Sequence, residues 1–363
     1  MTGVYVHIPF CIRKCPYCDF FSTRADEAEM EEYTRRLCDR ISLCAKKYPR
    51  IADTLYFGGG TPAVLGEERL CRIYRAVSEG FGLAENAEVT LEVNPGKKDI
   101  SFETLRKCGF NRVSIGLQSC NDNELRLLGR LHSSSDAVRC ISSARAAGFE
   151  NISLDLMIAT PSQTGESLKR SIAFCAENGA EHISAYLLKI EEGTPYFAMK
   201  DSLGLCDDDE QAELYMLAVS TLDEYGYRQY EISNFSREGF ESRHNLIYWH
   251  DEEYFGFGSA AHSFIDGRRR HYERSFESFY RDELIDDGEG GGEEEFIMLG
   301  LRLSEGISFE KYRQRFGREL PEKYRKRAER LVTPGFTVTD EKGIRLTKKG
   351  FLVSNAVIAN LLE

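Results

Sequence analysis

The chain has 363 residues, of which 42% are hydrophobic, and a formal net charge of −12 from 47 basic and 59 acidic side chains. This length and composition predict a large globular domain with a smaller one beside it. The negative charge argues against binding to nucleic acid or to anionic membrane surfaces. No stretch approaches the ~20 apolar residues of a membrane helix, and no secretory signal is recognisable. We therefore expect a cytoplasmic protein that is not an integral membrane protein.

Short β-branched runs alternate with amphipathic helical stretches along the first half of the chain. Strands are expected at 4–8, 54–57, 89–93, 113–117, 152–157 and 182–187. Helices are expected between them at 25–47, 67–80, 101–107, 135–147 and 165–178. Repeated strand–helix units predict an α/β fold with parallel strands and right-handed crossovers. The pattern alone is compatible with an incomplete barrel and with an open doubly wound sheet.

The second half of the chain predicts a change of architecture. A helix at 208–225 is followed by irregular, aromatic-rich sequence to about residue 264. The run 286–293 (DDGEGGGE) predicts a flexible acidic linker. Beyond it, helices at 294–303, 309–316 and 322–331, a strand at 344–346 and a last helix to Leu362 predict a small winged-helix-like domain. The expected units are thus 1–285, the linker 286–293, and a C-terminal helical domain at 294–363.

Three cysteines, Cys11, Cys15 and Cys18, follow the first expected strand with the spacing CxxxCxxC. Soft thiolates bind iron–sulfur clusters or zinc. Structural zinc sites usually take a fourth Cys or His from a second pair, and no such pair is evident, although zinc stays an open alternative. The spacing therefore predicts a [4Fe–4S] cluster with one iron left for an outside ligand. The other eight of the 11 cysteines are scattered, which predicts a reducing compartment without a disulfide framework.

Polar residues recur where the expected strands end. The turn Gly58-Gly59-Gly60-Thr61-Pro62 follows the second strand, and Glu92, Gln118 and Asp155 lie in or after later ones. Singly, each has a plain structural explanation, because glycine-rich runs are often only turns and buried carboxylates often pair with basic side chains. Together they predict one ligand site, since α/β folds bind ligands at the carboxyl ends of their strands.

The cysteine motif, with Tyr17 before the third cysteine, matches the signature of the radical S-adenosylmethionine (SAM) superfamily. The segment 5–11 (YVHIPFC), and almost the whole chain, resembles the oxygen-independent coproporphyrinogen III oxidase family, and within it the HemW branch of heme chaperones. The resemblance implies a partial (β/α)6 TIM-like barrel. It also implies a [4Fe–4S] cluster whose open iron binds SAM, which one-electron reduction cleaves to a 5′-deoxyadenosyl radical.

The resemblance further assigns residues to SAM. These are Tyr5, Gly59, Gly60, Thr61, Glu92, Gln118, Arg130 and Asp155. Arg130 would pair with the SAM carboxylate, a task that suits the guanidinium fork. The sequence departs from the family at one point, because Ala159-Thr160-Pro161 stands where the family usually has Gly-Leu-Pro.

Two features separate the branches of the family. The oxidases carry a further cysteine two residues after the third, where this chain has Phe20, and an N-terminal extension, where only four residues precede Tyr5. Both favour a chaperone that delivers heme to acceptor hemoproteins, respiratory ones among them, with an electron donor as a further partner. The alternatives are an oxidase that decarboxylates two propionates and a radical SAM enzyme for another substrate, so enzymatic activity stays open.

The segment 244–249 (HNLIYW) matches the HNxxYW motif of the HemW branch and holds the only tryptophan. From the residues alone, a packed aromatic loop is the commoner interpretation. The resemblance instead favours heme binding, with His244 as axial iron ligand and Asn245, Tyr248 and Trp249 around it.

Neighbouring residues offer further heme contacts. His250 is a competing iron ligand, and His262 is expected at the barrel mouth. The run 268–270 (RRR) suits heme propionates, although an exposed polar turn is the more common role for such a run.

Overall fold

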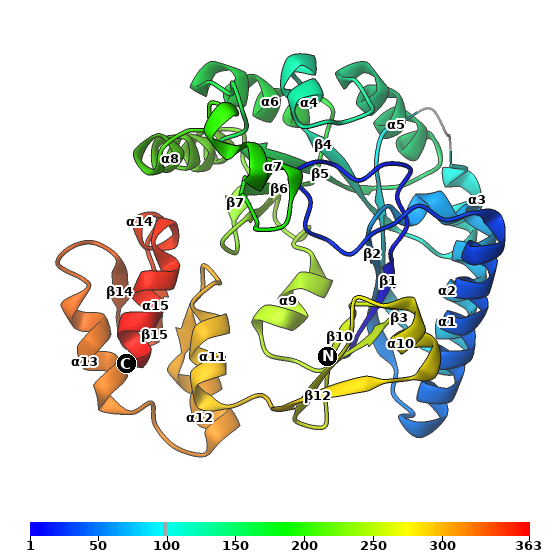
Figure 1. The fold of residues 1–363 in the computed structure, drawn as a ribbon. Coiled ribbons are helices and arrows are strands. Elements are labelled where there is room, and N and C mark those ends of the chain that lie inside the picture. Colours follow the sequence, from blue (N-terminus) through cyan, green and yellow to red (C-terminus); the bar gives the residue numbers. More distant parts are fainter. Residues whose placement is uncertain (97–99) are drawn as a thin grey trace.

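The computed structural model describes residues 1–96 and 100–363 and shows a large sheet wrapped by helices, with a small unit beside it (Figure 1). In the described chain, six parallel strands follow one another in sequence order. They are β1 (Gly3–Ile8), β2 (Ala52–Gly59), β3 (Leu83–Val93), β4 (Arg112–Gln118), β5 (Asn151–Ile158) and β6 (His182–Leu187). This order confirms the partial (β/α)6 barrel over the open doubly wound sheet, in which the order would reverse.

Helices cover the outer face of these strands (Figure 1). They are α1 (Glu27–Lys47), α2 (Glu67–Gly80), α3 (Phe102–Cys108), α4 (Asp122–Leu127), α5 (Ser134–Ala146) and α6 (Gly165–Glu177), with the short η1 (Pro62–Leu65) before α2. The longest, α1, begins with a capping box between Asp26 and Glu29, which stabilises a helix start by about 1 kcal/mol. Met30, Tyr33 and Leu37 lie on its buried stripe.

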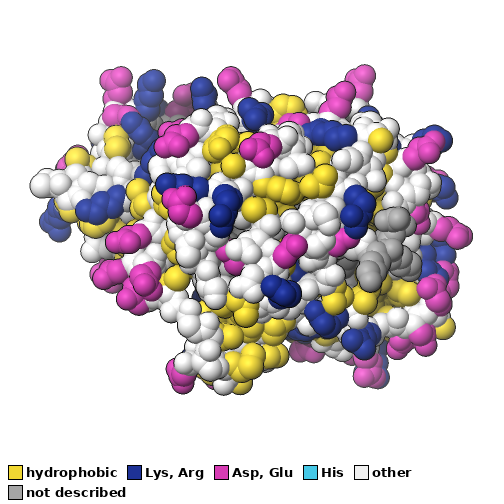
Figure 2. Space-filling view, turned by 90° about the horizontal axis from the view of Figure 1, so that it is seen from above, with side chains coloured by type: hydrophobic (Ala, Val, Ile, Leu, Met, Phe, Trp, Pro, Cys, Tyr) yellow, Lys and Arg dark blue, Asp and Glu magenta, His cyan; other side chains and the backbone are white. Residues whose placement is uncertain are grey.

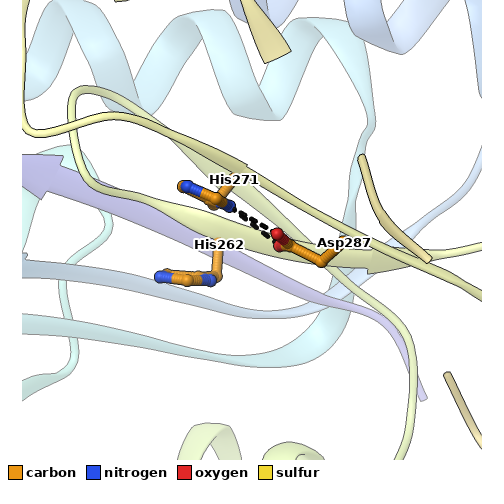
Figure 3. Close-up of side chains that lie close together, drawn as sticks. All are labelled: His262, His271 and Asp287. Atoms are coloured by element: carbon orange, nitrogen blue, oxygen red, sulfur yellow. Dashed lines mark hydrogen bonds and ion pairs between the residues drawn. The ribbon is translucent and has the colours of Figure 1, made fainter. Parts of the chain in front are cut away.

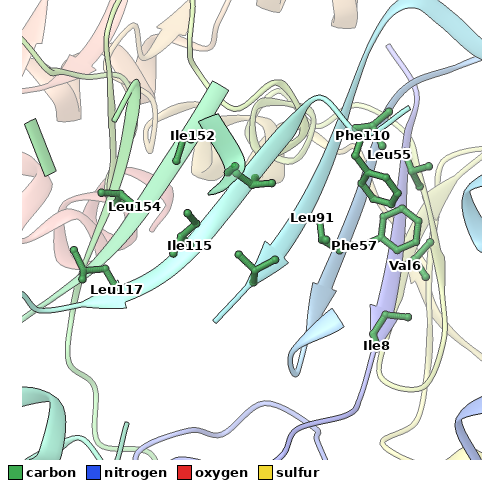
Figure 4. Close-up of a cluster of buried hydrophobic side chains, with 14 of the residues drawn as sticks. Val6, Ile8, Leu55, Phe57, Leu91, Phe110, Ile115, Leu117, Ile152 and Leu154 are labelled. Atoms are coloured by element: carbon green, nitrogen blue, oxygen red, sulfur yellow. The ribbon is translucent and has the colours of Figure 1, made fainter. Parts of the chain in front are cut away.

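The main core lies between these helices and the strands. Figure 4 shows apolar side chains of β1 to β5 packed in a row across the sheet, Val6, Leu55, Leu91, Ile115 and Leu154 among them. All five are fully buried. Strands of a parallel sheet are apolar on the face that helices cover, so polar residues in these same strands are confined to the barrel interior.

The sheet continues beyond the six strands on both sides. In the described residues its order is β12-β11-β10-β9-β1-β2-β3-β4-β5-β6-β8-β7. The added strands are β7 (Arg228–Gln229), β8 (Asn234–Ser236), β9 (Tyr254–Phe257), β10 (His262–Ile265), β11 (Arg268–Tyr272) and β12 (Leu284–Glu289). The accompanying helices are α7 (Pro195–Met199), η2 (Lys200–Ser202), α8 (Asp208–Glu224), α9 (Arg243–Trp249) and α10 (Phe276–Arg281). The region expected to be irregular therefore contains the short strands β7 to β9, the start of β10 and the helix α9.

The predicted flexible linker at 286–293 is wrong over its first half. Its residues up to Glu289 belong to β12, which pairs antiparallel with β11. The acidic strand faces a basic one, and Arg268 donates two hydrogen bonds of 2.8 Å to Asp286. Cross-strand pairs of opposite charge stabilise such a ladder. The arginine run 268–270 thus contacts carboxylates of the protein itself.

The C-terminal unit has its own core, built from residues such as Ile297, Tyr312 and Ile344. It contains α11 (Glu293–Gly300), β13 (Ile307–Ser308), α12 (Phe309–Phe316), α13 (Glu322–Arg330), β14 (Thr337–Thr339), β15 (Gly343–Leu346), α14 (Lys348–Leu352) and α15 (Ser354–Leu362). Within these residues the sheet order is β13-β15-β14. The order of these elements, from α11 to β15, resembles that of a winged helix. The unit contains three strands, whereas the sequence predicted one.

Charges of both signs are mixed on the surface. In the view from above in Figure 2, lysine and arginine side chains alternate with aspartate and glutamate around hydrophobic patches. Among the described residues, no helix combines the length and apolarity needed to cross a membrane.

A buried carboxylate connects the sheet extension to the C-terminal unit. The side chain of Asp251 is 0% exposed and accepts hydrogen bonds from Arg269 of β11 at 2.9 Å and Arg315 of α12 at 2.7 Å. Burial raises the pKa of Asp251 to about 6, although the positive charge of Arg315 acts to lower it. The two arginines therefore hold a charge that would be costly to bury alone.

We predict that Asp251→Asn lowers the free energy of unfolding by about 2 kcal/mol, because the amide cannot accept from both guanidinium groups. Asparagine keeps the size of the side chain and tolerates the backbone φ of 54° at this position. Urea unfolding at pH 8 measures the change. Asp286→Asn, at the exposed pair with Arg268, is the control with little effect. An unchanged unfolding midpoint for Asp251→Asn would contradict the role of this contact.

Candidate functional site

The three cysteines lie on one loop that leaves the carboxyl end of β1. The base of the loop is closed by hydrogen bonds from Cys11 N to Thr23 O and from Thr23 N to Pro9 O, at 2.9 and 2.8 Å. Within the loop, Cys18 N donates to Cys15 O at 3.1 Å. All three thiols are free and partly exposed. The loop thus presents three candidate ligands without holding them in disulfides.

The spacing of the sulfurs differs from that of a single-metal site. Among the described residues, the only three side chains whose ligand atoms all lie within 4.8 Å of one another are His262, His271 and Asp287. The three cysteine sulfurs are therefore more widely spaced than this limit. A tetrahedral zinc ion would need sulfurs about 4 Å apart. Thiolates on separate irons of a cubane stand further apart, so the loop fits a cluster better than zinc.

Arg130 connects the cysteine loop to the barrel. Its Nη1 lies 3.7 Å from Cys15 Sγ and 3.5 Å from the Tyr17 hydroxyl. Its Nη2 donates to the Gly116 carbonyl at 2.8 Å and also to the Asn94 side chain. Its Nε is buried and has no partner among the described residues. A buried donor without a partner beside a thiol loop suits an anionic ligand.

The glycine-rich turn packs directly against the cysteine loop. Gly59 has φ +112°, and a side chain there would lie 2.6 Å from the His7 ring. A Cβ on Gly60 would lie 2.7 Å from the Phe10 carbonyl oxygen. Thr61 Oγ1 accepts from Asn94 at 2.7 Å and lies 3.5 Å from Cys11 Sγ. Only glycine allows this close approach, so the turn brings backbone groups next to the thiols.

Two half-buried carboxyl groups, those of Glu92 and Asp155, lie on neighbouring parts of the barrel strands. Tyr56 donates to Glu92 at 2.7 Å, and Ser114 donates to Asp155 at 3.0 Å. Among the described residues, neither carboxyl forms an ion pair with a basic side chain. Burial raises the pKa of Glu92 to about 7 and also raises that of Asp155. Carboxyls with raised pKa values and no ion pair are candidates for a ligand site.

Two further residues predicted to bind SAM, Gln118 and Tyr5, lie on the same strands as this site or on neighbouring ones. Gln118 ends β4 with φ 67°, an unusual conformation for a residue other than glycine and one that clusters at functional sites. Tyr5 stacks on Tyr56 with ring centroids 6.2 Å apart, and its hydroxyl lies 3.1 Å from His7 Nδ1. His7 and Asn94, which the sequence interpretation missed, are thus part of the same network. The alternation in β1, which places residues 5 and 7 on one face, is the signal that would have found His7.

The structure places His244 in the barrel wall. Its ring is 1% exposed, with Nδ1 2.7 Å from Thr54 Oγ1 and Nε2 2.7 Å from the Tyr248 hydroxyl. Burial lowers the pKa of His244 to about 3, so the ring is neutral. Because both nitrogens are engaged, this conformation argues against a bond from His244 to iron, and the predicted ligand role stays untested.

The other residues of the HNxxYW motif, and His250 after it, contact different parts of the structure. The backbone N–H of Asn245 donates the helix-cap hydrogen bond to Ser242 Oγ at 3.4 Å. The guanidinium of Arg302 lies 5.6 Å from the Trp249 ring centroid, at the C-terminal unit. His250 Nε2 lies 3.1 Å from Glu305. Of the motif, Tyr248 alone lines a cavity that lies beside the cysteine loop.

That cavity has a volume of about 1000 Å³ and lies between β1, α9 and the strands β9 to β11. His262 and His271 line it, and their rings stack with centroids 5.0 Å apart at 21°. His271 Nδ1 lies 2.8 and 2.9 Å from the two oxygens of Asp287, as Figure 3 shows. His271 and Asp287 were missed by the sequence interpretation. The turn at Asp266-Gly267 would have indicated the hairpin that pairs residue 262 with residue 271.

Comparisons with known proteins agree with this geometry. A model of the radical SAM superfamily matches residues 5–175, which include the three cysteines, and a model of the HemN C-terminal domain matches residues 294–353. The heme chaperone HemW of Bacillus subtilis is 36% identical to this chain, covering 100% of it and 99% of that protein. A Mus musculus protein, radical S-adenosyl methionine domain-containing protein 1, mitochondrial, is 33% identical, covering 99% of this chain and 87% of that protein.

A solved structure shows the same fold. Coproporphyrinogen III oxidase (HemN) from Escherichia coli, described as a radical SAM enzyme, matches with a TM-score of 0.85 at 22% identity. The match covers 99% of this chain and 89% of that one. At this identity the likeness concerns the fold alone.

We predict that Tyr56→Phe raises the pKa of Glu92 above its value of about 7. The hydrogen bond from the Tyr56 hydroxyl stabilises the ionised carboxyl, and the variant removes it. Carbon-13 NMR of protein labelled at glutamate carboxyl carbons measures the titration, with Glu92→Gln identifying the signal. Tyr74→Phe, whose hydroxyl is remote from Glu92, is the control. A pKa that stays constant or falls in Tyr56→Phe would contradict this assignment of the hydrogen bond.

Proposed function

The chain belongs to the family of the heme chaperone HemW, and from this membership we propose that it binds a [4Fe–4S] cluster, SAM and heme and delivers heme to acceptor hemoproteins. The observation that carries the proposal is the full-length relation to HemW of Bacillus subtilis, at 36% identity over 100% of the chain. The geometry supports it at two places, the cysteine loop and the cavity beside it.

Cys11, Cys15 and Cys18 would hold the cluster, which when bound supplies one-electron chemistry and an iron open to SAM. The protein's own residues would position SAM around it. Arg130, with its unpartnered buried Nε, suits the carboxylate of SAM. Glu92 suits the amino group of SAM, because a cation favours the ionised form of a carboxyl whose pKa is about 7.

The remaining residues assigned to SAM also suit a ligand. The backbone at Gly59, Gly60 and Thr61 offers polar groups next to the thiols. Tyr5, Gln118 and Asp155 would complete the interior wall of the barrel. Their proposed role is to orient SAM and exclude water, which keeps a reactive site dry.

The cavity of about 1000 Å³ suits heme. Phe20 and Phe21, which follow Cys18, form part of its wall, so the cavity borders the cysteine loop. The oxidase branch has a cysteine at the position of Phe20, and the apolar ring here favours binding of a macrocycle over a further ligand. Heme bound there would lie near the cluster and beside Tyr248 of the HNxxYW motif.

The proposed partners are heme, an acceptor hemoprotein such as a respiratory cytochrome, and an electron donor for the cluster. The odd number of cysteines, 11, fits a reducing compartment without a disulfide framework, which supports action in the cytoplasm. The net charge of −12 does not favour nucleic acid as a partner.

We predict that Cys15→Ala removes iron and sulfide from protein purified without air and leaves heme binding largely intact, because the heme cavity does not include Cys15. Iron, sulfide, zinc and heme are quantified in the same preparation. Cys38→Ala, in the middle of α1, is the matched control and keeps its iron. Stoichiometric zinc in the wild type, or full iron in Cys15→Ala, would refute the cluster.

An activity assay separates the chaperone from the oxidase. Reconstituted protein is incubated anaerobically with SAM, a reductant and coproporphyrinogen III, and separately, loaded with heme, with a heme-free respiratory cytochrome. We expect heme to appear in the cytochrome and no protoporphyrinogen to form. Steady formation of protoporphyrinogen would instead establish oxidative decarboxylation and overturn the chaperone proposal.

A further inference from the structure

We infer that His271, held by Asp287, is the axial ligand of the heme iron, in the cavity between β1, α9 and β9 to β11. The inference rests on the proposed function that the chain binds heme. It deepens that function by naming the iron-binding side chain and the side of the barrel on which heme sits.

The chain has seven histidines, all within the described residues, and most of them are engaged elsewhere. Three are buried with both ring nitrogens in hydrogen bonds, namely His7, His182 and His244. His132 is 6% exposed and lines a different cavity. His250 contacts Glu305 and lies outside the large cavity. His262 and His271 therefore are the candidates that face the large cavity with a ring nitrogen available.

His271 has the orientation of an iron ligand. Asp287 lies 2.8 Å from Nδ1, so Nδ1 carries the proton and donates it to the carboxylate. Nε2 then keeps its lone pair and points away from Asp287 (Figure 3). A carboxylate behind a metal-binding histidine fixes the tautomer and raises the basicity of the ring. This is the arrangement that a neutral imidazole needs to bind iron.

His262 supports His271 from the side. The two rings are nearly parallel, with centroids 5.0 Å apart, and belong to opposite residues of the β10–β11 hairpin. Rings stacked in this way cannot bind one iron from opposite faces of a macrocycle. The geometry thus makes His262 a neighbour of the ligand and not a second axial ligand of the same iron.

The walls of the cavity suit a flat macrocycle with an acidic edge. The aromatic residues among them are Tyr5, Phe20, Phe21, Tyr248, Tyr254 and Tyr272. Aromatic side chains offer flat apolar surface for stacking. Arg274 lies at the same cavity, bonded to the exposed Asp19 at 2.9 Å, where its guanidinium can pair with a propionate.

Heme titration of His271→Gly tests the inference. We expect wild-type protein to show a histidine-ligated Soret spectrum and His271→Gly to lose it, with heme affinity at least about tenfold weaker. Added imidazole restores the spectrum in the glycine variant, which a merely misfolded protein would not allow. His250→Gly is the matched control, because it too pairs with a carboxylate, and its side chain is 25% exposed against 26% for His271.

Asp287→Asn tests the positioning role of the carboxylate. The variant keeps a hydrogen-bonding partner for Nδ1 but removes the negative charge. We expect the iron–histidine stretch of the ferrous heme to shift to lower frequency in resonance Raman spectra, because the ring becomes a weaker donor. A stretch at the wild-type frequency would contradict the contact between Asp287 and the ligand.

The outcomes distinguish this inference from the function on which it rests. If wild-type protein binds no heme, the proposed function fails. If it binds heme and His271→Gly keeps the wild-type spectrum and affinity, only the ligand assignment fails. If His262→Gly or His250→Gly loses the Soret spectrum and regains it with imidazole, while His271→Gly is unaffected, the iron ligand is His262 or His250 and the assignment is overturned. Zinc bound by His262, His271 and Asp287 so tightly that it excludes heme would overturn it as well.

Discussion

The guanidinium of Arg130 is the contact on which the site depends, because it joins parts that are far apart in the sequence. It reaches the cysteine loop at Cys15 and Tyr17, the end of β3 at Asn94 and the end of β4 at Gly116. The position of the cysteine loop over the barrel is fixed by this side chain together with the glycine turn, the hydrogen bond of 3.0 Å from Tyr196 N to the Pro16 carbonyl and the pair between Arg274 and Asp19.

Burial controls the protonation of the groups inside the barrel. Burial raises the pKa of Glu92 to about 7, so a cationic ligand beside it would favour the ionised carboxyl. Burial keeps His244 neutral and fully hydrogen-bonded, which makes it a structural link between α9 and β2. His271, in β11 of the sheet extension, keeps an available nitrogen. The interior thus suits SAM and the extension suits heme, with the cysteine loop between them.

Local patterns in the sequence predicted the alternating strands and helices and the cysteine loop, because both depend on periodicity and spacing within short segments, whereas the choice of a partial barrel came from the resemblance to a known family. The linker at 286–293 was wrong because β12 is stabilised by arginines about 18 residues away, and composition alone carries no trace of that pairing. The role of His244 could not be read from its motif either, since its burial depends on Thr54 of a distant strand. The Asp-Gly turn at 266–267 did carry a local signal for the β10–β11 hairpin.

The central claim is that three thiolates hold a four-iron cluster whose remaining iron accepts SAM. Mössbauer spectroscopy of iron-57 protein, reconstituted without air and measured before and after addition of SAM, tests it most directly. We expect one of the four iron subsites to change its isomer shift when SAM is added while the other three keep theirs. A spectrum without a four-iron cluster, or one in which no subsite responds to SAM, would contradict the claim.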